Sequence, residues 1–148
     1  MLAPLSTDTL LDRDLMLGFA DFAPHPMLKV PAYFFKMIRI NTGEEMGKIN
    51  LRTETTKDIE LYAGHIGYSV EAPYRGHRYA ARSIKLLLPF AHQLEINPLW
   101  ITCDPANLAS RRSCDLAGAE LVEIIDISPE YPGFALGQRQ KCRYRLHP

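Results

Sequence analysis

The sequence predicts one mixed α/β domain in which helices cross between neighbouring strands of a sheet. Its 148 residues suffice for a single core, because folding at this size buries ~68 to 70% of the unfolded chain's surface. Segments with strand character come first, and the remainder reads helix, strand, helix, strand, strand. Helices between consecutive strands are typical of a sheet with crossover connections.

Composition and charge are those of an ordinary globular protein. Hydrophobic residues make up 47% of the chain and charged residues 23%, so the chain is neither disordered nor fibrous. Lys and Arg number 17, as do Asp and Glu. A neutral chain has no global field that attracts nucleic acid or an anionic membrane. We therefore expect neither as a partner, and any charge chemistry has to be local.

The cysteines and the N-terminal segment indicate a reduced, cytoplasmic environment. The first 20 residues carry no cationic segment ahead of an apolar core, so no secretory signal is expected. No apolar run approaches the ~20 residues that span a bilayer. Cys103, Cys114 and Cys142 are odd in number and far apart, which favours free thiols over a disulfide framework or a zinc site. No metal is expected.

The first half of the chain reads as strands. Pro24, Pro26 and Pro31 leave little room for helices near the N-terminus, because proline breaks them. Gly43 lies in the turn of a hairpin, and Pro73 ends the last strand of this half. We expect strands over residues 14–17, 33–40, 46–51 and 60–70.

The second half contains two helices. Apolar residues recur between Ala80 and Leu94 at the spacing of a helix with one buried stripe, which predicts a helix over residues 79–94. Pro89 should kink or end it early. The other expected elements are a strand at 98–103, a helix at 107–117 closed by Gly118, a strand at 120–127, a loop at 128–138 and a strand at 139–146.

The last strand, RQKCRYRL, alternates between two faces. Arg139, Lys141, Arg143 and Arg145 share one face, which we expect to be solvated and to discourage edge pairing.

Basic residues gather where the first helix begins, in the stretch EAPYRGHRYAARSI. The first amides of a helix lack partners and the helix dipole is positive there, so this turn suits an anion. Gly76 allows close backbone approach, and Arg75 and Arg78 can donate to phosphate oxygens, with Arg82 one turn further on. The alternative is that these cations are simply solvated. Neither GxxxxGK[ST] nor GxGxxG is present.

The same stretch resembles the acetyl-coenzyme A (acetyl-CoA) signature of the GNAT acetyltransferase superfamily, [QR]xxGx[GA]. Arg75 fills the first position, Tyr79 an aromatic position and Ala80 the last small position. NLASRRSCDLAGAELV is similar to the superfamily's second helix and following strand. RQKCRYRL is similar to the terminal strand of the branch that acetylates the N-termini of ribosomal proteins.

This resemblance implies a GNAT acyltransferase fold, with a mostly antiparallel sheet, helices on both faces and a shortened N-terminal region. It implies an N-acetyltransferase that uses acetyl-CoA as donor and takes an amine-bearing acceptor, either a small molecule or a protein N-terminus. Only 32 residues precede the first clear strand, so we expect an open acceptor side that suits a peptide N-terminus, with residues 128–138 as a lid or wall. A monomer or a homodimer is expected.

The resemblance also implies a cofactor site. Amides from Gly76 to Ala81 would wrap the pyrophosphate, and the preceding strand would pair with the pantetheine arm. Asn107 would contact the same arm, although it is also a good helix N-cap. Arg78 replaces the signature's central glycine, at a cost of ~1 to 2 kcal/mol if φ is positive. The implied cofactor residues are Tyr68, Ser69, Val70, Arg75, Gly76, His77, Arg78, Tyr79, Ala80, Ala81 and Asn107.

Catalytic roles remain open between several residues. Many relatives carry a tyrosine proton donor where this chain has Cys114, so the donor is Cys114, Ser110 one helical turn earlier, or water. The alternative for Cys114 is packing in the core. For the base, His65 has the best-matched intrinsic pKa, although a lone histidine on a strand is more often a structural residue. Glu60 acting through water is the rival on the opposite strand face. The resemblance places the oxyanion donor on an amide near Val70. Alternative functions are an inactive GNAT module that binds CoA and an unrelated anion-binding adaptor.

Overall fold

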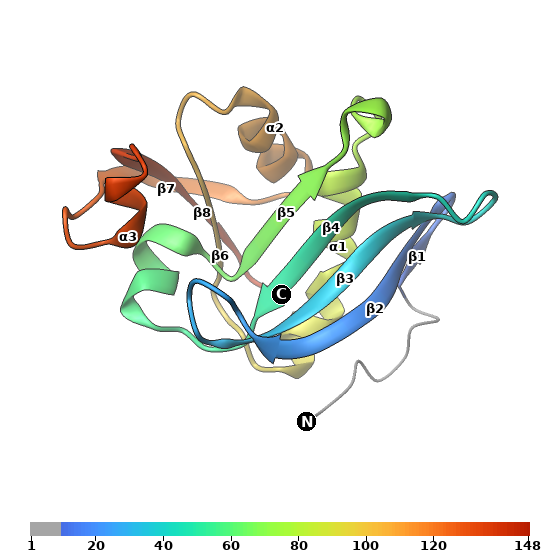
Figure 1. Cartoon of the computed structure of the whole chain (residues 1–148), viewed down its shortest axis with the longest axis horizontal. Helices are drawn as coiled ribbons and strands as arrows, with labels where there is room; N and C mark the ends of the chain where they lie inside the picture. The colour runs from blue at the N-terminus through green and yellow to red at the C-terminus, as the bar shows by residue number, and fades with distance from the viewer. Residues whose placement is uncertain (1–9) are drawn as a thin grey trace.

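The computed structural model describes residues 10–148 and builds two antiparallel sheets from them (Figure 1). In the first, five strands follow one another in chain order, and in the second β8 lies between β6 and β7. The first sheet contains β1 (Leu11–Asp12), β2 (Leu15–Pro24), β3 (Pro31–Arg39), β4 (Glu45–Arg52) and β5 (Ile66–Val70). The second contains β6 (Leu99–Cys103), β7 (Glu120–Asp126) and β8 (Gln140–Leu146).

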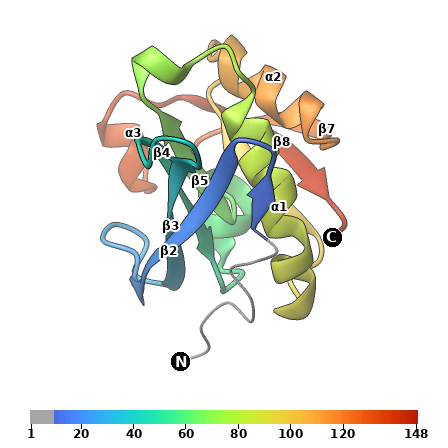
Figure 2. The same cartoon turned by 90° about the vertical axis from the view of Figure 1, so that its right-hand side faces the viewer.

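One long helix, α1 (Tyr79–Gln93), covers one face of the larger sheet (Figure 2). The buried stripe of α1 meets Tyr33 and Phe35 of β3 through Phe90, with ring centroids 4.8 and 6.5 Å apart. Aromatic pairs in this range stabilise a core beyond their area alone. The mixed α/β fold expected from the sequence is therefore confirmed.

Shorter helices lie in the connections that follow β5, β6 and β7. A 3₁₀ turn, η3 (Ala72–Tyr74), links β5 to α1, and α2 (Leu108–Leu116) links β6 to β7. The expected loop at 128–138 contains one helical turn, α3 (Pro132–Ala135). No helix within residues 10–148 is both long enough and apolar enough to cross a membrane.

The connection between β2 and β3 is short. Residues 25–30 close it as a tight loop, in which His25 N donates to Val30 O at 2.7 Å. No helix separates these two strands in the described part of the chain.

On the sheet face opposite α1, paired residues Lys36 and Lys48 are exposed. Strand β2 is longer than the four residues expected, and Pro24 stands at its end, where proline is tolerated.

The strand expected over residues 60–70 is wrong in its first half. Ile59–Ala63 form a single π-helical turn, η2, and β5 starts only at Ile66. Gly64 separates the two with φ +73°, and a Cβ there would lie 2.8 Å from the Trp100 carbonyl oxygen. The close approach of β6 therefore decides this boundary, and a local pattern does not contain that information.

The early end considered at Pro89 does not occur, because α1 continues to Gln93. Pro89 and Lys85 both lie on the exposed side of the helix, so water can bind the Lys85 carbonyl that loses its partner. Phe90 and Ala91 beyond the proline are buried. Their packing holds the last turn in place.

The basic face of β8 is not uniformly solvated, which corrects the expectation for Arg143. This side chain is buried, its guanidinium lies 4.0 Å from the Trp100 ring centroid, and Nη1 donates to Glu123 Oε1 at 2.8 Å. Nη2 donates to Glu60 O at 2.9 Å. A buried charge requires such partners. Arg143 therefore ties β8 to β7 and η2.

Arg82, from the basic cluster, also has a structural role. Its Nε lies 2.5 Å from Asp12 Oδ2 and its Nη2 lies 2.6 Å from Asp14 Oδ1. Tyr79 Oη donates to Asp14 Oδ2 at 2.5 Å. The start of α1 is thereby attached to the turn between β1 and β2. The hydrogen bond from Tyr79, followed by that from Arg82, lowers the pKa of Asp14 to about 2.

We predict that this attachment makes stability depend on acid. Because the pKa of Asp14 falls from 3.8 to about 2 on folding, its contribution is complete above pH 3.8 and is lost as pH falls through 2. Thermal melts of Asp14→Asn should show a shallower loss of Tm than the wild type between pH 4 and pH 2. Asp21→Asn, at an exposed aspartate, is the control. Parallel curves for wild type and Asp14→Asn would contradict the assignment.

Candidate functional site

A cleft of about 960 Å³ opens where the two sheets separate. Strands β5 and β6 are joined at their base, where His65 N donates to Trp100 O at 2.7 Å. Beyond this point the strands belong to different sheets. Residues 66–70 line one wall of the cleft and residues 102–104 the other. The edge of β5 that does not pair with β4 therefore faces an open space.

Most of the cofactor residues expected from the sequence line this cleft. Those that line it are Tyr68, Ser69, Val70, Arg75, Gly76, Arg78, Tyr79, Ala80, Asn107 and the candidate donor Ser110. Those that do not are His77, Ala81, His65, Glu60 and Cys114. Within residues 10–148 no cluster of His, Cys, Asp or Glu has the geometry to hold a metal ion.

The basic turn forms one end of the cleft. Gly76 has φ +89°, and Arg78 sits at the N-cap of α1 with φ 62° and ψ 24°, so the left-handed backbone considered for Arg78 is present. The first hydrogen bond of α1 runs from Arg82 N to Arg78 O. No side chain among residues 10–148 caps this helix. Its first amides are thus free to bind an anion.

Two neighbouring residues connect the turn to the cleft walls. Arg75 Nε donates to Val70 O at 3.0 Å, which attaches the turn to the end of β5. Asn107 Oδ1 accepts from Ser110 N at 3.1 Å, so Asn107 is the N-cap of α2 while it also lines the cleft. The capping role expected for Asn107 is confirmed.

A pair of hydroxyl groups lies inside the cleft. Tyr68 of β5 reaches across to α2, where its Oη is 2.6 Å from Ser110 Oγ. Burial raises the pKa of Tyr68 above its ordinary value of 10.0, so the phenol stays protonated at neutral pH. When Tyr68 donates to Ser110, the serine hydroxyl hydrogen is free to donate to a third group. Sequence reasoning assigned only the backbone of Tyr68, because a contact between β5 and α2 is long-range.

Cys114 is packed in the core. It is fully buried, and burial raises the pKa of its thiol to about 12. The thiol does not line the cleft, so the structure gives no support to Cys114 as proton donor. Cys103 does line the cleft, and burial raises the pKa of its thiol to about 11. Both groups remain uncharged thiols at neutral pH.

His65, expected as a candidate base, is held inside the protein. It is 0% exposed, Trp100 N donates to its Nδ1 at 2.9 Å, and its Nε2 lies 2.8 Å from Thr55 Oγ1. Burial, and then the nearby Arg52, lower the pKa of His65 to about 4. Neither ring nitrogen is free to accept a proton from a substrate. His65 instead holds the junction of β5 and β6.

Glu60 is an exposed residue of η2, and its backbone oxygen accepts from Arg143. Glu60 and His65 do not lie on opposite faces of one strand, as the sequence predicted, because Glu60 is not in a strand.

The far end of the cleft is formed by residues that the sequence did not assign to the cofactor or catalytic site, although Gln138 belongs to the lid or wall expected at 128–138. They are Arg52, Ala63, Thr102, Gln138 and Lys141. Arg52 is only 8% exposed. A signal was available, since Arg52 continues the alternation of Lys48 and Asn50 along β4, but the expected strand ended one residue earlier.

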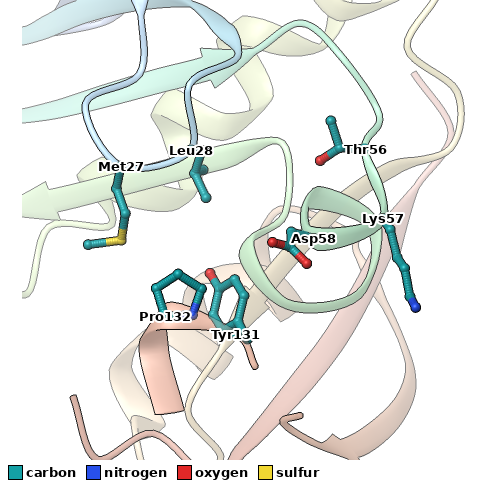
Figure 3. A pocket seen from close by; sticks show the side chains of 7 residues that line it. All are labelled: Met27, Leu28, Thr56, Lys57, Asp58, Tyr131 and Pro132. Atoms are coloured by element: carbon teal, nitrogen blue, oxygen red, sulfur yellow. The ribbon is translucent and has the colours of Figure 1, made fainter. Parts of the chain in front are cut away.

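A second, smaller hollow of about 390 Å³ lies beside the loop between β2 and β3 (Figure 3). Three segments form it: the loop contributes Met27 and Leu28, residues 56–58 form a second wall, and Tyr131 and Pro132 form the third. The residues expected as a lid or wall, 128–138, therefore contact both spaces, because Gln138 lines the large cleft.

We predict that His65 makes stability depend on pH near neutrality. Its pKa is about 4 when folded and 6.5 in the ordinary state, so the unfolded chain binds the proton more tightly. Stability should decrease as pH falls from 6.5 towards 4. His65→Asn, which can still accept from Trp100 N, should lower Tm at pH 7 and flatten this slope in thermal melts. His92→Asn, at an exposed histidine, should keep the slope. A full slope in His65→Asn would contradict the assignment.

Comparison with solved structures supports the same fold. A Vibrio cholerae protein assigned as a ribosomal-protein-serine acetyltransferase matches with TM-score 0.61 and 23% identity over 79% of this chain. The ribosomal-protein-S5-alanine acetyltransferase from Vibrio fischeri matches with TM-score 0.61 and 16% identity over 78%. The microcin C7 self-immunity acetyltransferase MccE, solved with acetyl-CoA and AMP, matches with TM-score 0.61 and 15% identity over 79%.

This chain covers 64%, 61% and 61% of the lengths of those three proteins. No protein of curated function matches it significantly by sequence. A family model for the GNAT acetyltransferase domain matches residues 14–120. This range includes β2 to β5, the basic turn, α1 and α2. The chain therefore belongs to the GNAT acetyltransferase family.

Proposed function

We propose that this protein is an acetyl-CoA-dependent N-acetyltransferase that acts on a primary amine. One observation carries the proposal: the uncapped start of α1, the free edge of β5 and the Tyr68–Ser110 pair all face one continuous cleft. An anion-binding turn, an open backbone edge and a hydroxyl donor are what a diphosphate, an amide-containing arm and a thioester respectively require.

Acetyl-CoA would supply the activated acetyl group. In the proposed complex the amides of residues 76–81 and the guanidinium groups of Arg75 and Arg78 hold the pyrophosphate. The arm follows β5 towards Tyr68 and pairs with its backbone. This direction brings the thioester beside the Tyr68–Ser110 pair.

Acetyl transfer needs two proton movements. The departing thiolate accepts a proton, which the proposal assigns to the Ser110 hydroxyl, with Tyr68 donating to Ser110 in its turn across their 2.6 Å contact. The attacking amine must lose a proton. Neither His65 nor Glu60 lines the cleft, so the proposal assigns this proton to water at the open acceptor side. A β5 amide donates to the oxyanion of the intermediate.

The acceptor side favours a bulky amine such as a peptide N-terminus. Residues 25–30 form a short loop where the family usually has two helices, and the hollow of about 390 Å³ lies next to it. Residues 128–138 provide a wall. Two of the similar structures are named as acetyltransferases of ribosomal proteins, which is consistent with a protein acceptor.

We predict that Arg78→Gly and Arg78→Ala separate the backbone role of Arg78 from its side-chain role. Because Arg78 has φ 62°, Arg78→Gly should be more stable than Arg78→Ala by about 1 kcal/mol. Both variants lose the guanidinium, so calorimetry should show CoA affinity reduced about tenfold in each. Equal stabilities would contradict the strain, and unchanged affinity would remove Arg78 from the cofactor site.

The function itself is tested by calorimetric titration of the wild type with CoA, together with an assay of amine-dependent release of free thiol from acetyl-CoA. We expect binding and turnover. Tyr68→Phe and Ser110→Ala should bind CoA within about twofold of wild type but lose roughly tenfold or more in kcat. Ser113→Ala is the control, at a half-buried α2 serine that lines the same cleft but whose hydroxyl donates to Ala109 O.

Absence of CoA binding would overturn the proposal. Binding without release of thiol for any amine would select the alternative of an inactive CoA-binding module. Full activity in both Tyr68→Phe and Ser110→Ala would leave the enzyme in place but reject the donor assignment.

A further inference from the structure

The far end of the cleft holds a buried cation without an acidic partner. Arg52 lies at the end of β4 that pairs with the start of β5, whereas the basic turn follows the end of β5. At ~3.3 Å per residue, the two ends of β5 are separated by roughly 13 Å. Arg52 is therefore remote from the proposed pyrophosphate site and lies near the acyl end of the proposed arm.

The contacts of Arg52 use only part of its guanidinium. Nη1 donates to the backbone oxygens of Ala63 and Gly64 at 3.1 and 3.0 Å. Nε is buried and has no hydrogen-bond partner within residues 10–148. Nη2 lies over Gly67, where a Cβ would approach it to 2.4 Å. The absence of a side chain at Gly67 therefore makes room for this group.

This arrangement is costly unless a ligand completes it. A buried charge without a counterion is strongly unfavourable, and within residues 10–148 no carboxylate forms an ion pair with Arg52. Burial lowers the pKa of Arg52 to about 10, so the group remains charged at neutral pH. The unused Nε and Nη2 form one edge of the guanidinium, which matches the two oxygens of a carboxylate.

The surroundings of Arg52 reinforce a preference for an anion. Lys141 and Gln138 line the same end of the cleft. Asp104 also lines the cleft, and its charge acts on Lys141. Tyr131 would raise the pKa of Arg52 if it were charged. Burial raises the pKa of Tyr131, so it is a neutral phenol at physiological pH. Arg52 thus remains the uncompensated cation of this region.

We infer that Arg52 binds a carboxylate of the substrate. The inference rests on the proposed function and specifies its substrate class: an amine acceptor that carries a carboxylate, such as a peptide with an acidic residue near its N-terminus, or an acyl group that ends in a carboxylate. Both sources present the same two oxygens to the same guanidinium edge. They differ in whether the amine acceptor or the acyl donor carries the carboxylate.

The test measures kcat/KM with matched substrates. The acceptor arm compares two peptides that differ only by Asp or Asn at the second residue, with acetyl-CoA as donor. The donor arm compares succinyl-CoA with acetyl-CoA on the Asn peptide. In one arm the wild type should prefer the carboxylate about tenfold or more. Arg52→Gln should reduce this preference to within about twofold, and Arg52→Lys should retain part of it because lysine keeps the charge but not the fork.

Lys48→Gln is the matched control. Lys48 is an exposed cation on the same strand and the same face, so its removal changes the net charge equally and should leave the preference intact. A wild type without carboxylate preference in either arm, or an Arg52→Gln variant that keeps it, would overturn the inference while acetyl transfer itself stands.

A second readout does not depend on turnover. Glutarate should raise the Tm of the wild type and of Lys48→Gln but not that of Arg52→Gln, since an ion that binds only the folded state stabilises it. If no amine is acetylated, the proposed function fails, and this comparison alone decides the carboxylate site. An equal shift in all variants, or none in the wild type, would then overturn it. Because Arg52 also holds residues 63 and 64, Arg52→Lys serves in this comparison if Arg52→Gln does not fold, with an expected Tm shift smaller than that of the wild type.

Discussion

The junction between β5 and β6 is the constraint on which the rest of this structure depends. At this point His65 N donates a backbone hydrogen bond to Trp100 O. Trp100 N in turn donates to Nδ1 of the His65 ring. Gly64 permits the close approach. Because the strands are joined here and nowhere further along, they diverge, and the divergence creates both the cleft and the free edge of β5. His65, one of two candidate bases in the sequence, is instead the residue that joins the two sheets at the base of the cleft.

Arginines are distributed over the molecule according to whether they are paired. Arg82 and Arg143 are attached to acidic side chains and join elements that are distant in sequence. Arg75 and Arg78 lie at the basic turn, next to helix amides that no side chain caps within the described residues. Arg52 is buried without an acidic partner there. In a chain with zero net charge, five cations that form no ion pair within residues 10–148 line one cleft: Arg52, Arg75, Arg78, Arg112 and Lys141. They create a local field there for an elongated anionic ligand.

Much of the fold could be predicted from the sequence, because its elements are defined by local patterns. The hairpin of β3 and β4, helix α1, the Asn107 cap and the alternation of β8 appear close to their expected positions. The failures lie where distant residues decide the local structure. Glu60 is helical because η2 packs against β6 and β8. Pro89 is tolerated because Phe90 and Ala91 in the last turn of α1 are buried. Arg143 is buried because its guanidinium packs on Trp100 and pairs with Glu123.

The same distinction applies to the candidate site. The sequence by itself determined the basic turn, with its glycine and its arginines, since helix starts and turn chemistry are encoded within a few neighbouring residues. The left-handed backbone of Arg78 was only a condition until the structure showed it. Only the tertiary structure decided which side chains meet across the cleft. Tyr68 reaches Ser110 over 42 positions of sequence, Cys114 turns into the core, and Arg52 comes to face Gly67. These pairings depend on how two sheets separate, and that geometry is a property of long-range packing.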